Sequence, residues 1–282
     1  MNVKKIIPYL IAIVAFTIAS LTYFYPVLSG KQIKQSDIVQ FKGMAKEIQD
    51  FREEYETEPY WTGASFSGMP AYPVSAYYPN DFIRKLDLAL RFLPRPADYT
   101  FLYFLSFFVL MLALKIDWRL AILGALAFGF STYLIIIFGA GHNGKAHAIA
   151  YMPLVIAGVL WIFNKQFMIG FLVTSLAMAL EVYANHIQMT YYLGFCLLIY
   201  GLVEFAAALK ENSFAIFIKK SAVVLTAVII GVAMNAPRLM ALKEYGEMST
   251  RGKSELTIQP DGTPKQATVG LDKNYITEYS YA

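Results

Sequence analysis

Cysteine, histidine and charged residues are all scarce in this chain. Its single cysteine, Cys196, lies inside an apolar run, which excludes an internal disulfide and argues against a cysteine-based metal site. Lys and Arg total 24 of 282 residues, form no long block and leave a net charge of only +4, which argues against a nucleic-acid partner. The sequence contains no internal repeat and no low-complexity tract.

Hydrophobic residues are abundant instead. They make up 57% of the chain, charged residues only 16%, and the mean hydropathy is +0.47, which is typical of a polytopic membrane protein. Seven apolar runs cover residues 6–28, 99–114, 120–138, 148–163, 167–183, 190–209 and 221–236. The sequence therefore predicts an all-α membrane protein with about seven transmembrane helices, the first of them an uncleaved signal-anchor.

The distribution of basic residues predicts the orientation, because short cytoplasmic connections hold most of the positive charge. With the amino terminus inside, the inner connections carry Lys4, Lys5, Lys115, Arg119, Lys165, Lys210, Lys219 and Lys220. The short outer turns carry only Lys145, whereas Arg238 and Lys243 argue weakly for the opposite orientation. We expect a cytoplasmic amino terminus.

Two polar segments then lie outside, namely the first loop, residues 29–98, and the tail, residues 237–282. In the loop, apolar residues recur every three or four positions over residues 38–55 and again over 81–92, which predicts two helices at the membrane surface. We divide the chain into a seven-span module, residues 1–236, and the start of an extracytoplasmic segment, residues 237–282, of a longer protein.

The three histidines, His142, His147 and His186, all fall in polar breaks on the side that also receives Asp37. A carboxylate just past the first span could act as general base on an acceptor hydroxyl at the membrane surface. Asp37 with Gln40 three residues later also resembles a capping box at a helix start. The two roles are compatible.

The turn at residues 139–147 is the most unusual short stretch, with three glycines, His142, Lys145 and His147. Exposed backbone N–H groups and basic side chains at a helix start could bind a phosphate or pyrophosphate head group. The alternative is a tight interhelical turn with a snorkelling lysine. A metal is a further alternative, although the two histidines are five residues apart and do not share a helical face.

A second polar cluster, Glu181, Asn185, His186 and Gln188, lies at the outer end of the fifth span. On a continuing helix Glu181, Asn185 and Gln188 would share one face. An intramembrane carboxylate indicates a site or a contact between helices, and the sequence leaves both open. In the tail, Arg251 and Lys253 form a basic turn that could contact phosphates, as could any basic residue near lipid head groups.

The arrangement of a signal-anchor, a large outer loop with an early Asp, and six more spans resembles the module of GT-C glycosyltransferases. Four motifs are similar to those of the bacterial YfhO-like membrane protein family: QSD at 35–37, FLPRPADY at 92–99, GHNGKAH at 141–147 and TRGKS at 250–254.

The resemblance extends over essentially the whole chain. It implies a polyprenyl-phosphate-sugar-dependent glycosyltransferase of the bacterial cytoplasmic membrane, acting on the extracytoplasmic face on a glycolipid or polymer acceptor of the cell envelope.

The same resemblance implies that Asp37 is the general base and that Lys145, His142 and Arg251 hold the donor phosphate. GT-C enzymes often have two adjacent acidic residues in this loop, whereas this chain has Ser36-Asp37. The departure leaves a divalent metal and a second carboxylate open, with Glu181 a candidate by location only. No other cofactor is implied.

The sequence is compatible with two other functions. A flippase for a lipid-linked saccharide could use the same basic residues, but it should carry polar residues through the membrane midplane, and these spans are apolar except near the outer edge. A non-catalytic scaffold for envelope assembly would tolerate loss of Asp37 or Lys145.

Overall fold

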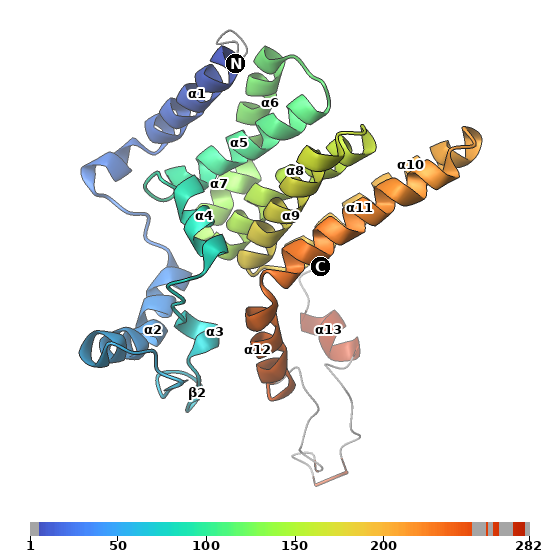
Figure 1. The fold of residues 1–282 in the computed structure, drawn as a ribbon. Helices are drawn as coiled ribbons and strands as arrows, with labels where there is room; N and C mark the ends of the chain where they lie inside the picture. Colours follow the sequence, from blue (N-terminus) through green and yellow to red (C-terminus); the bar gives the residue numbers. More distant parts are fainter. Residues whose placement is uncertain (1–5, 250–257, 259–261, 265–272, 280–282) are drawn as a thin grey trace. The chain divides into compact units, whose positions relative to one another are not determined.

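The computed structural model describes residues 6–249, 258, 262–264 and 273–279. Most of this part of the chain is helical (Figure 1). The chain forms two compact units, the first from Met1–Met44 and Tyr77–Asn235 and the second from Ala45–Ala76 and Ala236–Ala282. The predicted division at residue 236 stays a prediction.

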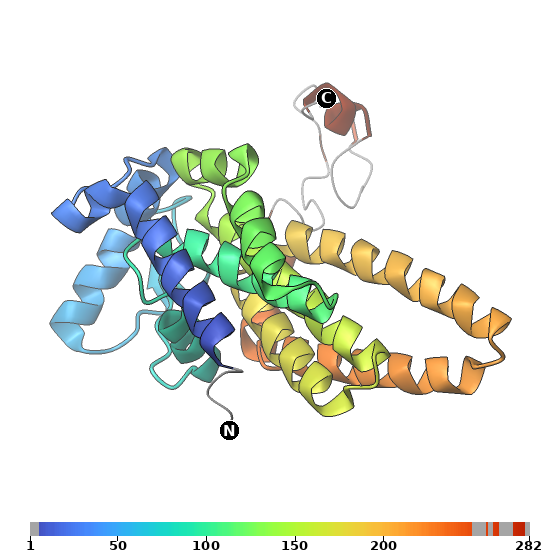
Figure 2. The same cartoon turned by 90° about the horizontal axis from the view of Figure 1, so that it is seen from above.

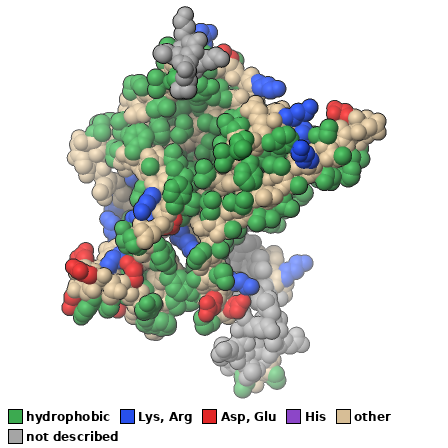
Figure 3. All heavy atoms as spheres, in the orientation of Figure 1, with side chains coloured by type: hydrophobic (Ala, Val, Ile, Leu, Met, Phe, Trp, Pro, Cys, Tyr) green, Lys and Arg blue, Asp and Glu red, His purple; other side chains and the backbone are tan. Residues whose placement is uncertain are grey.

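The first unit is a bundle of apolar helices. It begins with α1 (Ile7–Tyr23), the short 3-10 helix η2 (Tyr25–Ser29) and the start of α2 (Ser36–Tyr55). Its other helices are α4 (Phe82–Leu90), α5 (Ala97–Ala113), α6 (Trp118–Gly129), α7 (Thr132–Ala140), α8 (Asn143–Phe163), α9 (Phe167–Tyr183), α10 (Ile187–Lys210) and α11 (Phe214–Ala233). On the face drawn in Figure 3, hydrophobic side chains cover most of this bundle.

Within the described residues, three helices are long and apolar enough to cross a membrane, namely α8, α10 and α11. The number rises to four if α6 and α7, which are bent by 41° at their junction, form one broken span. The apolar helices α1, α5 and α9 have 17 residues each, about 25 Å at 1.5 Å per residue, against about 30 Å of hydrocarbon core. The structure therefore supports a few membrane-spanning helices, the predicted segment 120–138 is two helices, and the count of seven stays a prediction.

Burial differs sharply among these helices. In the most apolar 18-residue stretch of α8, 67% is buried. In the corresponding stretches of α10 and α11, only 11% is buried. Figures 1 and 2 show α10 and α11 as a long antiparallel hairpin that projects from the bundle. Because the hairpin exposes mostly apolar side chains, lipid is the environment that suits it.

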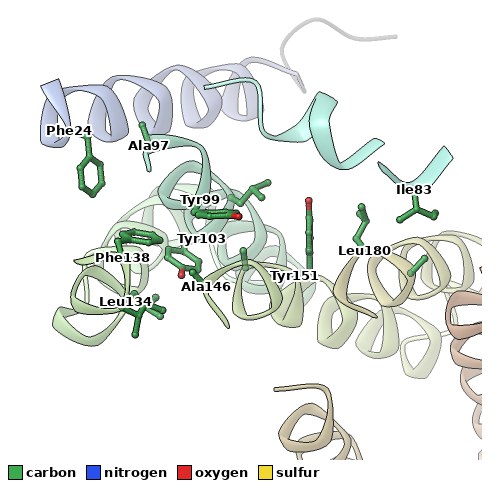
Figure 4. Packing of buried hydrophobic residues seen from close by; sticks show 14 residues of the cluster. Phe24, Ile83, Ala97, Tyr99, Tyr103, Leu134, Phe138, Ala146, Tyr151 and Leu180 are labelled. Carbon is green, nitrogen blue, oxygen red and sulfur yellow. The ribbon is translucent and has the colours of Figure 1, made fainter. Parts of the chain in front are cut away.

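An aromatic core fills the bundle around α5 and α8. Tyr99 and Tyr103 stack on Phe138 with ring centroids 6.1 and 5.8 Å apart, and Tyr151 lies in the same cluster (Figure 4). Beside this core, α8 packs closely along α9. A Cβ added at Gly158 of α8 would lie 2.7 Å from the backbone nitrogen of Thr174, so only glycine permits this approach of the two backbones.

Both helices predicted between residues 29 and 98 form, whereas their place in an outer loop at the membrane surface stays a prediction. The pattern over residues 38–55 corresponds to α2, and that over 81–92 corresponds to α4, whose N-cap Asp81 accepts a hydrogen bond from the amide N–H of Arg84 at 3.0 Å. Asp37 lies inside the first turn of α2, one residue after the helix begins, where a carboxylate interacts favourably with the helix dipole.

The second unit contains the rest of α2 and a small hairpin. Its other elements are β1 (Trp61–Thr62), β2 (Met69–Pro70), α3 (Tyr72–Ser75), α12 (Ala236–Glu247) and α13 (Lys273–Tyr279). Strands β1 and β2 pair antiparallel. The Glu47 carboxylate fixes the hairpin to α2, since it accepts hydrogen bonds from the Thr62 hydroxyl at 2.6 Å and from the amides of Gly63 and Ala64 at 2.9 Å each.

Candidate functional site

Asp37 and His142 face each other at one end of the bundle. Asp37 comes from the first turn of α2, and His142 is the N-cap residue of α8. Their atoms Oδ2 and Nε2 are 3.8 Å apart, and about half of each side chain is exposed, 52% and 53%. Two residues that the sequence proposes for different roles therefore meet at one accessible position.

Gly141 makes this meeting sterically permissible. Its φ is +87°, and an added Cβ would lie 3.1 Å from Cβ of Asp37 and 3.3 Å from Cβ of Gln35. A side chain at this position would be strained by the backbone conformation and would press on both residues. Gly139, two residues earlier in the last turn of α7, has open space around it.

A pair of buried amides joins the start of α2 to the start of α8. Gln35 Nε2 donates to Asn143 Oδ1 at 3.2 Å, and Asn143 Nδ2 donates to Gln35 Oε1 at 3.3 Å. Gln35 also donates to the backbone carbonyl of Phe138. These bonds span more than 100 residues of sequence and hold Asp37 and His142, their near neighbours in sequence, on adjacent backbones.

Lys145 and His186 lie close to the same exposed end. The Lys145 ammonium is 5.2 Å from the centroid of the Tyr133 ring. His186 is the N-cap residue of α10. Burial lowers the pKa of His186, and the nearby Lys145 ammonium lowers it further. The three basic residues are therefore near enough to influence one another electrically.

His147 has a different environment from His142. Its Nε2 lies 2.5 Å from Oδ1 of Asp87, and the hydroxyl of Tyr151 donates to the same oxygen at 2.8 Å. Arg91 donates to Oδ2 of Asp87 through Nη2 at 2.5 Å and through Nε at 3.0 Å. His147 and Asp87 are both buried, so His147 contributes to a closed cluster and not to the accessible face.

The cluster continues to a second buried carboxylate. Arg91 Nη1 donates to Oδ2 of Asp98 at 3.1 Å, and Arg95 Nε lies 3.7 Å from the same atom. Burial alone raises the pKa of Asp87, but the hydrogen bonds and charges of His147 and Arg91 outweigh it and hold this pKa well below its usual value. Asp87 is therefore a fixed anion.

Sequence reasoning missed Asp87, Arg91, Asp98 and Tyr151. A usable signal was present, because Asp87 and Arg91 are four residues apart and share one face of a helix. Nothing in the sequence identifies Tyr151 as their partner, since it follows Asp87 by 64 residues inside an apolar run.

Glu181 is buried and binds another helix. Both carboxylate oxygens accept from the Thr190 hydroxyl at 3.0 Å, which links α9 to α10. Helix α9 ends at Tyr183, and Asn185 has a φ of +56°, so the chain turns and the continuous helical face considered from sequence does not form. Gln188 donates to the hydroxyl of Tyr192 on its own helix at 2.8 Å.

A cavity of about 720 Å³ adjoins the paired amides in the first unit. It is partly open to solvent and is bordered by the segment after η2, the first turns of α2 and residues 94–98, and Gln35 and Asn143 form part of its wall. The volume lies in the range of small-molecule sites.

Two predicted phosphate ligands, Arg251 and Lys253, lie outside the described residues. In the described part of the chain, no group of three or more His, Cys, Asp or Glu side chains is arranged to hold a metal ion. Comparisons with protein-family models, with curated proteins and with solved structures find no match for this chain.

Proposed function

We propose that this protein is a membrane glycosyltransferase of the GT-C type, related to the YfhO-like proteins that its motifs resemble. It moves a sugar from a polyprenyl-phosphate donor to a cell-envelope acceptor. The observation that carries the proposal is the exposed Asp37 carboxylate beside His142, with Lys145 and His186 close by.

The proposed topology places this cluster at the water–lipid boundary. All seven apolar segments cross the bacterial cytoplasmic membrane, the amino terminus is cytoplasmic, and the loop 29–98 and the tail are extracytoplasmic. A substrate with a hydrated sugar head group and a lipid tail requires a site at such a boundary.

In the proposed reaction, Asp37 removes the proton of an acceptor hydroxyl. The acceptor oxygen attacks the anomeric carbon and forms the new glycosidic bond while the bond from that carbon to the phosphate oxygen breaks. Polyprenyl phosphate leaves with the bonding electron pair. Lys145 and His142, with Arg251 from the tail, hold its negative charge, and the proton that Asp37 has taken up passes to water at the exposed face.

The buried groups have supporting roles. Glu181 is engaged by Thr190, and His147 by Asp87, so neither is free to replace Asp37 as base. Asn185, His186 and Gln188 line the outer turn between α9 and α10, where they would border the substrate.

The test is transfer of labelled sugar from polyprenyl-phosphate donors to membrane acceptors, in vesicles that contain the protein at matched levels. We expect Asp37→Asn to lower the rate by about 10²- to 10⁴-fold, the usual contribution of a general base. Glu53→Gln, an exposed acid on the same helix, is the matched control and should leave the rate unchanged.

Transfer that survives in Asp37→Asn would leave this residue with its favourable position at a helix start and no catalytic role. Absence of transfer by the wild type with every donor would overturn the proposal in favour of lipid-linked saccharide transport or a scaffold.

A further inference from the structure

The cavity beside the paired amides is lined mostly by positive charge. Lys31 and Lys34 come from the segment after η2, Lys42 from α2, and Arg95 from the loop before α5. Asp98 is the one acidic side chain in the wall. Four basic groups and one acidic group leave a formal net charge of +3 around about 720 Å³.

The lysines are available to a ligand. Among the residues that the structure describes, no carboxylate lies within ion-pair distance of Lys31, Lys34 or Lys42. The charge of Asp98, by contrast, is already engaged by Arg91 and Arg95. A concave wall with an excess of one sign of charge focuses its potential into the cavity and attracts ions of the opposite sign.

Arg95 is held in place before any ligand arrives. Its Nε is 3.7 Å from Oδ2 of Asp98, and its guanidinium lies over the Tyr99 ring at 4.7 Å from the centroid. A guanidinium that is fixed on an aromatic face can still present its remaining N–H groups to an oxyanion. The cavity is therefore lined by three lysines without an ion-pair partner and by one arginine that is already positioned.

Another part of the boundary is fixed and neutral. Gln35 and Asn143 satisfy each other's amide groups and are both buried. They give the cavity a fixed wall without adding charge. Preformed geometry lowers the entropic cost of binding.

We infer that this cavity is an anion-binding site for a ligand that carries a phosphate monoester or diphosphate, groups whose charge of two to three matches the wall. The inference needs only the cavity and its charges, so it holds or fails independently of the transferase reaction. The phosphate can belong to a soluble molecule or to a lipid head group.

Binding is measured on the purified protein in neutral detergent, by calorimetric titration with inorganic pyrophosphate, and on the protein in phosphatidylcholine nanodiscs with and without phosphatidic acid. The test variant is Lys34→Gln combined with Lys42→Gln, which avoids the partners of Asp98. Lys85→Gln is the matched control, because Lys85 is an exposed lysine of α4 outside the cavity.

We expect saturable binding that the double variant weakens about tenfold or more, as loss of charge-assisted hydrogen bonds does, and that Lys85→Gln leaves unchanged. Such a response to pyrophosphate supports a soluble phosphate source, and a response to phosphatidic acid alone supports a lipid source. The inference is overturned if neither probe binds saturably, or if Lys85→Gln weakens binding as much as the double variant does.

Discussion

Two aspartates of this chain each face a histidine, and the two pairs differ in almost every other respect. Asp87 lies 2.5 Å from His147, has no exposed side-chain surface, and also accepts hydrogen bonds from Tyr151 and Arg91. Asp37 lies 3.8 Å from His142, and about half of its side chain is exposed.

The buried Asp87 carboxylate is fully occupied by contacts within the fold, whereas the exposed Asp37 carboxylate is not. The oxygens of Asp87 accept hydrogen bonds from Arg91, His147 and Tyr151. Removing any of these donors would leave the buried carboxylate with fewer interactions to offset the cost of its burial. Asp37, by contrast, has a single weak hydrogen bond from the Ser36 hydroxyl at 3.4 Å, and about half of its side chain is open to water. One pair holds helices together, and the other is accessible to solvent.

The largest effect on stability is expected for Asp87→Asn. The substitution leaves Arg91 with one buried carboxylate in place of two, so the free energy of unfolding should fall by about 3 kcal/mol or more. Thermal unfolding in detergent measures it. Asp37→Asn is the control and should change stability by less than about 0.5 kcal/mol. Equal losses in the two variants would show that Asp87 stabilises the fold no more than Asp37 does.

Acid should destabilise the protein through Asp87. Because the folded-state pKa of Asp87 lies below its unfolded value of about 3.9, its contribution is complete above that value and is lost as pH falls toward the folded pKa. Unfolding midpoints between about pH 5 and pH 2 should therefore drop more steeply in the wild type than in Asp87→Asn. Parallel curves would show that other carboxylates dominate the acid response.

A smaller effect is expected for Gly141→Ala. The positive φ should cost about 1–2 kcal/mol, and the new Cβ would displace Asp37, so sugar transfer should fall as well. Gly139→Ala is the matched control from the last turn of α7, where the added Cβ has open space. Unfolding and transfer are both measured, and a Gly141→Ala protein with unchanged transfer would show that the position of Asp37 is not critical.

Local patterns made part of the structure predictable. The three- and four-residue spacing of apolar side chains identified α2 and α4, and long apolar runs identified the helices of the bundle. The polar breaks identified the turn that carries His142, although its approach to Asp37 depends on the Gln35–Asn143 pair, which no local pattern reveals.

The remaining features depend on contacts between distant residues. His147 belongs to the same glycine-containing motif as His142. Because it lies five residues further along α8, it points in another direction and contacts Asp87, 60 residues earlier in the chain. The 41° bend between α6 and α7 interrupts a run that composition alone reads as continuous. That Arg251 binds the donor phosphate together with His142 and Lys145 stays a prediction.

The glycine at position 158 determines more than a local packing distance. Two smooth apolar helices surrounded by lipid can slide past each other with little change in energy, since lipid and side chains offer similar contacts. At Gly158 the backbone of α9 fills the space where a side chain would stand, so sliding would require the helices to separate first. The absence of a side chain at this position, in the last third of α8, thereby resists sliding of α8 along α9. It also fixes the relative height of the turns that carry His142 and His186, which lie at the same end of these two helices.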